Sequence, residues 1–211
     1  MASPLAEAPA PEGTANRRDI EMALRRQGTP LRFAGWDLTA ADLAGLDLRD
    51  CEFLRCRAAR ATLSSCNLAE ARFIGCDLNN AVCLQTLLSG TLFRDCKLTG
   101  LRVVAASTLG PSFERCILVS AQLHGLSFRR AALDGIDFQG ADLAEADFRQ
   151  AVLTGCNLRD ANLTDARFEG TDLRGADLGA LRLIDAARFK GAIISKRQAA
   201  ELLSGLGLKV L

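Results

Sequence analysis

Eight cysteines carry the most reactive side chains of this 211-residue chain, since thiols can form disulfides or bind metal ions. Their spacing argues against both roles. Four of them recur at every twentieth position, namely Cys56, Cys76, Cys96 and Cys116. Side chains that stack in register on parallel strands point the same way, so they fit a disulfide poorly and cannot surround a tetrahedral metal. We expect all eight to be buried and reduced, which suits a cytoplasmic protein.

Few other groups suggest catalysis. The single histidine, His124, has no recurrent partner in the sequence. Asp and Asn residues precede Leu or Phe at several positions between 137 and 177. Such residues commonly lie in turns, where their side chains accept hydrogen bonds from nearby backbone amides. The sequence therefore predicts a protein that is not an enzyme and that has no cofactor and no metal site.

A bulky apolar residue stands at every fifth position from Phe33 to Leu183, and 27 of these 31 positions are Leu or Phe. Two residues before each of them, 23 of 31 positions hold Ala, Cys or Thr. Neither a helix nor a strand buries residues at this period. Phenylalanines also recur at every twentieth position, in the series Phe33, Phe53, Phe73, Phe93, Phe113 and the series Phe128, Phe148, Phe168. Four units therefore complete one coil of a solenoid, and like side chains stack to form a core ladder.

The segment "ADLAEADFRQAVLTGCNLRDANLTDARFEGTDLRGADLGA" resembles the A(D/N)LXX consensus of the pentapeptide-repeat family. The resemblance covers about residues 31 to 194. It implies an all-β solenoid, a right-handed quadrilateral parallel β-helix of about eight coils. The large central residue and the small residue two before it would point inward.

The two ends of the chain differ from the repeat. Residues 1 to 15 are rich in Ala and Pro, which predicts a disordered tail. Residues 16 to 30 predict a capping helix with Asn16 as N-cap and Gly28 at its end, and a one-residue insertion is expected near residues 184 to 187. Residues 195 to 211 predict a helix from Ser195 and then a strand. The apolar side chains of this segment are too numerous to face solvent. They therefore predict a dimer interface at Leu202, Leu203, Leu206, Leu208 and Val210.

Between residues 82 and 112 the repeat keeps its register but places large apolar residues outward. These residues are Leu84, Leu87, Leu92, Val104 and Leu109. Either protruding loops cover this surface or it is a contact patch. Gly110 and Pro111 favour loops.

Charge is unevenly distributed although the net charge is only +1. Residues 31 to 130 hold 12 basic and 9 acidic residues, whereas residues 131 to 185 hold 5 basic and 11 acidic ones. An acidic rod can compete with DNA for a basic protein surface. The acidic residues predicted to bind such a partner are Asp134, Asp137, Asp142, Glu145, Asp147, Asp160, Asp165, Glu169, Asp172 and Asp177.

The segments "KRQAAELLSGLGLKVL" and "PSFERCIL" resemble the topoisomerase-protection branch of the family, the Qnr-type and MfpA-type proteins. This resemblance implies a homodimer, joined through its C-terminus, that binds DNA gyrase or topoisomerase IV in place of DNA. It would protect the enzyme from quinolones or natural-product inhibitors. The alternative is a rigid scaffold for another protein partner. We expect no direct binding to nucleic acid, and no apolar run is long enough to span a membrane.

Overall fold

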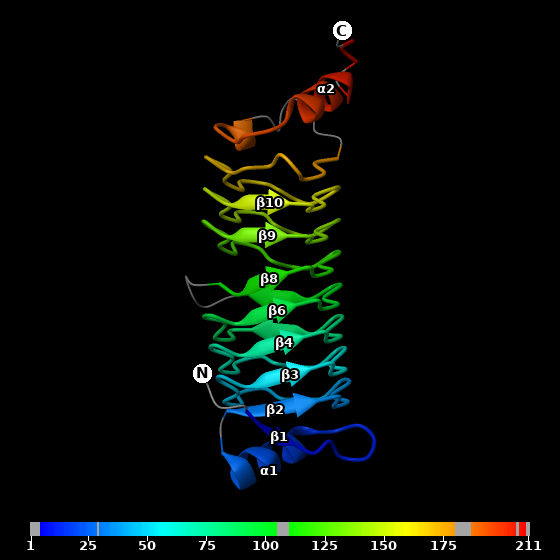
Figure 1. Cartoon of the computed structure of the whole chain (residues 1–211), viewed down its shortest axis with the longest axis vertical. Coiled ribbons are helices and arrows are strands. Elements are labelled where there is room, and N and C mark those ends of the chain that lie inside the picture. Colours follow the sequence, from blue (N-terminus) through cyan, green and yellow to red (C-terminus); the bar gives the residue numbers. More distant parts are fainter. Residues whose placement is uncertain (1–4, 29, 105–109, 180–186, 206, 210–211) are drawn as a thin grey trace.

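The structure is a computed structural model that describes residues 5–28, 30–104, 110–179, 187–205 and 207–209. The chain forms a rod of stacked coils with α1 at one end and α2 at the other (Figure 1). In chain order the elements are β1 (Ala6–Ala8), α1 (Arg17–Gln27), β2 (Leu31–Ala34), β3 (Glu52–Leu54), β4 (Arg72–Ile74), β5 (Val82–Leu84), β6 (Leu92–Arg94), β7 (Arg102–Val104), β8 (Ser112–Glu114), β9 (Ala132–Asp134), β10 (Val152–Thr154) and α2 (Lys196–Gly205).

Each coil has four faces, and backbone positions one coil apart pair in parallel. Face 1 carries two sheets, with strand orders β1-β2-β3-β4-β6-β8 and β10-β9. Face 2 is a ladder of single bridges through eight positions from Asp37 to Asp177. Face 3 carries the pair β5-β7, and face 4 includes the bridges Asp47–Asn67 and Ser127–Asp147. The predicted parallel β-helix is confirmed.

Phenylalanine rings form two stacked columns inside the rod. On face 1 the ring centroids of Phe33, Phe53, Phe73, Phe93 and Phe113 lie 4.6 to 5.3 Å apart. On face 4 the centroids of Phe128, Phe148 and Phe168 lie 4.8 and 5.0 Å apart, and Phe189 continues the column at 4.8 Å. The 20-residue interval of this column would place the next ring at position 188, but the ring that stacks on Phe168 is Phe189. This confirms the predicted one-residue insertion before Phe189.

The corners of the coil place side chains outward from a strained backbone. Among the described residues, sixteen other than glycine have positive φ there, including Arg60 at 60° and Glu145 at 59°. A left-handed conformation costs roughly 1–2 kcal/mol for a residue with a Cβ. The backbone bonds to the next coil, such as Glu145 N to Thr164 O at 2.7 Å, hold these corners in place.

All eight cysteines are buried, as predicted, and they stand as free thiols in the structure. Six of them approach a carbonyl oxygen of the preceding coil, as when Cys66 Sγ donates to Leu43 O at 3.0 Å. Thr91 Oγ1 makes the same bond to Leu68 O at 2.7 Å. Cys and Thr recur at the small inward position because each fills little space and donates to the coil below. Burial raises the pKa of Cys83 to about 12, so its thiol stays protonated and unreactive at neutral pH.

The disordered tail predicted for residues 1 to 15 is wrong for the part that the structure describes. β1 pairs in parallel with β2, and Thr14 forms a bridge with Asp37. This pairing covers the edge that the first coil would otherwise expose. The predicted helix is confirmed: the Asn16 side chain accepts from Arg18 N, the Asn16 N–H donates to Asp19, and Gly28 ends α1.

At the other end, α2 is fixed to the last coil by one buried side chain. Ser195 and Gln198 form a reciprocal cap, in which Ser195 N donates to Gln198 Oε1 at 2.8 Å and Gln198 N donates to Ser195 Oγ at 3.2 Å. Gln198 Nε2 then donates to Leu173 O at 2.6 Å and to Ala176 O at 2.8 Å. The strand predicted after this helix is not formed by residues 207–209, and Leu206 and Val210 lie outside the described residues.

We expect Gln198→Ala to loosen α2. The change removes the donor to Ala176 O and one of the two donors to Leu173 O, which still accepts from Ala176 N at 3.0 Å. A buried carbonyl left without a donor costs about 1–3 kcal/mol. Hydrogen exchange of the α2 amides should rise by about tenfold or more while exchange in β3 and β4 stays unchanged. Glu201→Ala on the exposed side of the same helix is the control. Equal exchange in both variants would contradict this role for Gln198.

Of the two alternatives for residues 82 to 112, residues 82–104 do not form protruding loops, because β5, β6 and β7 keep the regular coil, and residues 105–109 lie outside the described residues. Leu84 pairs in register with Val104, as predicted. Leu87 and Val104 remain 47% and 58% exposed, so the described structure does not cover them. Leu109 lies outside the described residues.

Candidate functional site

The ten acidic residues predicted to bind a partner are distributed around the rod. Face 1 holds Asp134 and Asp172, face 2 holds Asp137 and Asp177, face 3 holds Asp142, and face 4 holds Asp147 and Glu169. The remaining three stand at corners, Asp160 between faces 2 and 3, and Glu145 and Asp165 between faces 3 and 4. They therefore do not form a single surface.

Three of these carboxylates are neutralised by arginines. Asp147 is 6% exposed and accepts from Arg149 at 2.7 Å and from Arg167 at 3.1 Å. Hydrogen bonds from Arg174 lower the pKa of Asp172 to about 2, and Asp177 pairs with Arg159 at 3.0 Å. These three residues add little negative charge to the surface that a partner would meet.

Asp147 should make the stability of the rod depend on acid pH. Its hydrogen bond to Arg149, with further bonds to the Arg149 N–H and attraction to Arg167, lowers its pKa below the ordinary 3.8. A carboxyl group whose pKa is lower in the folded than in the unfolded state stabilises the fold at pH values above its unfolded-state pKa. This stabilisation is lost as the pH falls through the folded-state pKa. We expect Asp147→Asn to lower the free energy of unfolding by about 1–3 kcal/mol at pH 7 and by less at acid pH. Urea unfolding at pH 7 and pH 3 measures this, and an equal cost at both pH values would contradict it.

Asp137 and Asp142 have the structural role expected of turn residues. Each accepts the N–H of the residue two positions later, at 3.1 and 3.2 Å. Each also accepts from an asparagine one coil further on, Asn157 Nδ2 and Asn162 Nδ2, both at 2.9 Å. These neutral donors hold the carboxylates but do not cancel their charge.

Four carboxylates gather on face 3 and its two corners in consecutive coils, and we call them the acidic patch. Asp142 lies on the face and pairs one coil on with Asn162. Glu145 and Asp165 are stacked at one corner, and Asp160 stands at the other. Among the described residues, the basic side chain nearest this patch is His124, whose Nε2 lies 3.6 Å from a carboxylate oxygen of Glu145. The acidic patch consists of Asp142, Glu145, Asp160 and Asp165.

Face 3 also carries apolar side chains nearer the N-terminus. Val82, Leu84 and Val104 come from β5 and β7, and we call them the apolar strip. Leu87 lies just past the neighbouring corner on face 4, where it pairs with Asn67. Leu92 is not part of this surface, because it belongs to β6 on face 1, opposite Arg72. The structure thus places Leu84 and Val104 on the face that bears the acidic patch, with Leu87 beside it, and separates Leu92 from them.

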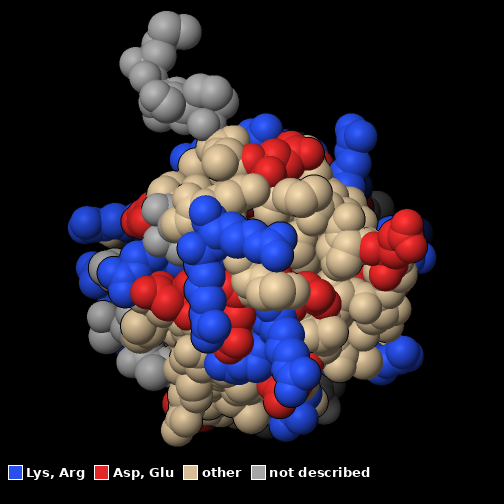
Figure 2. Space-filling view, turned by 90° about the horizontal axis from the view of Figure 1, so that it is seen from below, with Lys and Arg blue, Asp and Glu red and all other residues tan. Residues whose placement is uncertain are grey.

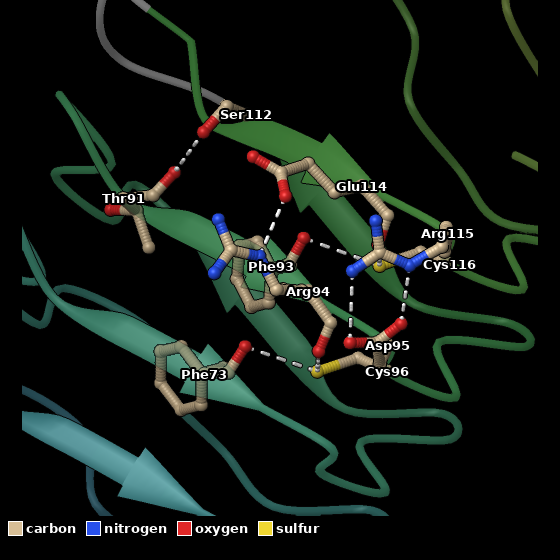
Figure 3. Close-up of polar contacts among 10 residues, drawn as sticks. All are labelled: Phe73, Thr91, Phe93, Arg94, Asp95, Cys96, Ser112, Glu114, Arg115 and Cys116. Carbon is tan, nitrogen blue, oxygen red and sulfur yellow. Dashed lines mark hydrogen bonds and ion pairs between the residues drawn. The ribbon is translucent and has the colours of Figure 1, made fainter. Parts of the chain in front are cut away.

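Charges in the N-terminal half pair across coils. On face 1, Arg94 donates to Glu114 at 2.6 Å and Arg115 donates to Asp95 at 2.7 Å, so the two pairs run in opposite directions between the same coils (Figure 3). Arg32 with Glu52 and Arg57 with Asp37 make similar pairs. These pairs were not predicted from the sequence, although opposite charges spaced one coil apart would have indicated them. Because these arginines are bound to their own acidic partners, they do not neutralise the carboxylates of the acidic patch.

The described residues contain no group of three or more His, Cys, Asp or Glu side chains arranged to hold a metal ion. Among the same residues, neither helix is long and apolar enough to cross a membrane. Surface hollows include one of about 270 Å³ at the N-terminal end and one of about 290 Å³ between residues 110–114 and 127–133.

Comparison with known proteins identifies the class. The family described as pentapeptide repeats matches residues 37–72, 66–100, 112–143 and 141–179. These segments span more than half of the chain, so the chain belongs to the pentapeptide-repeat family. No curated protein matches it significantly.

Solved structures share the fold. A trypsin-treated form of QnrB1, a plasmid-mediated fluoroquinolone resistance protein, is 21% identical, with a TM-score of 0.53 over 86% of this chain and 88% of that one. Full-length QnrB1 is 23% identical, with a TM-score of 0.51 over 84% of this chain and 88% of that one. At these identities the likeness concerns the fold.

Proposed function

We propose that the protein is a DNA mimic that binds DNA gyrase or topoisomerase IV and protects the enzyme from quinolones or natural-product inhibitors. The observation that carries the proposal is the acidic patch, whose carboxylates lack arginine partners in the described structure while Asp147, Asp172 and Asp177 have them. The similarity of fold to a fluoroquinolone resistance protein supports the same class of function.

Charge density supports the mimicry. The four carboxylates of the acidic patch belong to two consecutive coils, which rise by roughly 10 Å at about 4.8 Å per coil. That spacing of roughly one charge per 2.5 Å approaches the one charge per about 1.7 Å of duplex DNA. The backbone that carries the patch is held by hydrogen bonds between coils, so binding a partner would cost little conformational entropy in the backbone.

Inhibition of gyrase cleavage complexes tests the proposal. Adding the purified protein to gyrase, DNA and ciprofloxacin should reduce the amount of linearised plasmid, and the effect should weaken as salt rises from about 50 to 200 mM. Bovine serum albumin at the same concentration serves as the control. Unchanged cleavage at low salt would contradict the proposal for gyrase, and the same assay with topoisomerase IV covers the second enzyme.

We also propose that two copies join through their C-terminal ends. Exposed apolar side chains gather there, with Ile193 49%, Leu203 39% and Leu208 56% exposed. A dimer would cover them and extend the rod. Leu203→Arg with Leu208→Arg is expected to give a monomer by light scattering, as is deletion of residues 196–211. A dimer that survives both changes would contradict this interface.

The alternative function, a rigid scaffold for another protein, draws on the apolar strip, since Val104 is more than half exposed. Binding through that strip depends weakly on salt, whereas DNA mimicry depends on it strongly. Val104→Asp separates the two, because it should abolish binding to a scaffold partner and leave the salt-sensitive effect on gyrase in place.

A further inference from the structure

The N-terminal end of the rod contains a hollow that neither the repeat nor the proposed function uses. It measures about 270 Å³ and lies between residues 9–11 and α1. Its walls are Pro9, Ala10, Pro11, Asp19, Met22, Ala23, Arg26, Gln27 and Trp36. The pairing of β1 with β2 and the docking of α1 create it, so it belongs to the cap and not to the coils.

Two of the polar groups in its walls, on Trp36 and Asp19, already have hydrogen-bond partners. Trp36 Nε1 donates to Ala8 O at 3.2 Å, and the Asp19 carboxylate accepts from Asn16 N at 2.8 Å. An occupant therefore meets mainly apolar surface from proline, alanine and Met22. Pockets for drug-sized ligands measure roughly 300–1,000 Å³, so this hollow suits something smaller, such as one large apolar side chain.

A ridge of positive charge runs beside the hollow. At about 100° per residue, Arg18, Met22, Arg25 and Arg26 share one side of α1, opposite the buried Ile20. These arginines form no ion pair among the described residues, whereas Arg17 on another side of the helix pairs with Glu21 at 2.8 Å. Met22 is 47% exposed in the middle of this ridge. Lys and Arg side chains cross the centre of this end of the molecule, with acidic side chains between them (Figure 2).

We propose that this end is a docking site for an acidic segment of a partner protein that carries one large apolar anchor residue. The anchor would occupy the hollow and contact Met22 and Pro11. Carboxylates on either side of the anchor would pair with Arg18, Arg25 and Arg26. An apolar anchor in a pocket with a charged rim is the usual arrangement of an interface hot spot.

Charge complementarity and the hollow together favour a peptide over a nucleic acid. A duplex backbone makes repeated phosphate contacts and has no apolar group for the hollow. The acidic side chains on the same helix, Asp19 and Glu21, would repel a continuous row of phosphates. A peptide can avoid them, because it carries its charges at separate positions.

Fluorescence anisotropy with a labelled peptide of Glu and Asp residues around one central Phe tests the proposal on the full chain. The peptide with Ala in place of Phe should bind about tenfold more weakly, since it lacks the anchor. The combined change Arg18→Gln, Arg25→Gln and Arg26→Gln should weaken binding of the Phe peptide by about tenfold. The matched control is Arg55→Gln, Arg60→Gln and Arg72→Gln, three exposed arginines on the coils, and it should change the affinity by less than about twofold.

Ala10→Trp tests the hollow separately. It fills the space from an exposed position, so the variant stays folded by circular dichroism and should bind the Phe and Ala peptides equally. Equal affinity of the two peptides for the unaltered protein would overturn the proposal, as would an equal loss in the two triple variants. Tighter binding of a labelled DNA duplex than of the Phe peptide would overturn it as well.

Discussion

Replacing Phe73 by alanine should lower the free energy of unfolding by about 3–5 kcal/mol, the usual cost of emptying a large site in a packed core. Phe73 is 2% exposed and stacks on Phe53 at 4.6 Å and on Phe93 at 5.0 Å. Both stacking contacts are lost with the ring, and each contributes about 0.5–1.5 kcal/mol beyond the buried area. The rigid backbone ladders on either side prevent the coil from collapsing into the space. Urea unfolding followed by circular dichroism measures the change.

Arg72→Ala is the matched control, because Arg72 is the neighbouring residue in β4 and points away from the core. It should change stability by less than about 0.5 kcal/mol. A cost below about 1 kcal/mol for Phe73→Ala would mean that the rings do not form a continuous column.

Reversing the charge of the acidic patch should have the largest effect on the proposed function. The combined change Glu145→Lys, Asp160→Lys and Asp165→Lys should weaken binding to gyrase by roughly 100-fold, because like charges then face the basic DNA-binding surface. The three positions are exposed corners with positive φ. Arg60 and Arg130 adopt the same conformation elsewhere in the rod, so long basic side chains are compatible with it.

A second triple variant separates the pattern of charge from its total. Asp50→Lys, Asp134→Lys and Glu169→Lys change the net charge by the same amount at exposed positions away from the acidic patch. We expect this variant to bind gyrase within about threefold of the unaltered protein at physiological salt. Equal losses in the two variants would show that net charge alone drives binding and would remove face 3 as the interface.

The core of this fold is predictable from the sequence because the repeat is local and strict. The five-residue period places Phe33 and Phe53 in one column, and the structure confirms the stacking. The N-terminal segment before the first coil is harder to predict. β1 is short and rich in alanine, so its composition resembles a disordered tail, and it becomes a strand because the edge of β2 offers it backbone partners.

The candidate site is predictable only in part. The excess of acidic residues after position 130 is visible in the sequence, whereas the neutralisation of Asp147 and Asp172 depends on how arginines two positions later fold back onto them. The pattern Asp-Phe-Arg or Asp-Leu-Arg marks both sites and also Asp47 with Arg49. Loops were one of two alternatives for residues 82 to 112, and residues 82–104 instead keep the coil, because valine and leucine at outward positions still satisfy the backbone ladder.

Displacement of a labelled DNA duplex from gyrase by the unaltered protein tests DNA mimicry most directly. If face 3 occupies the DNA-binding surface, rising concentrations of the protein should release the duplex completely, and the concentration needed should increase steeply with salt. Formation of a ternary complex of gyrase, duplex and protein, with the duplex still bound, would contradict the account.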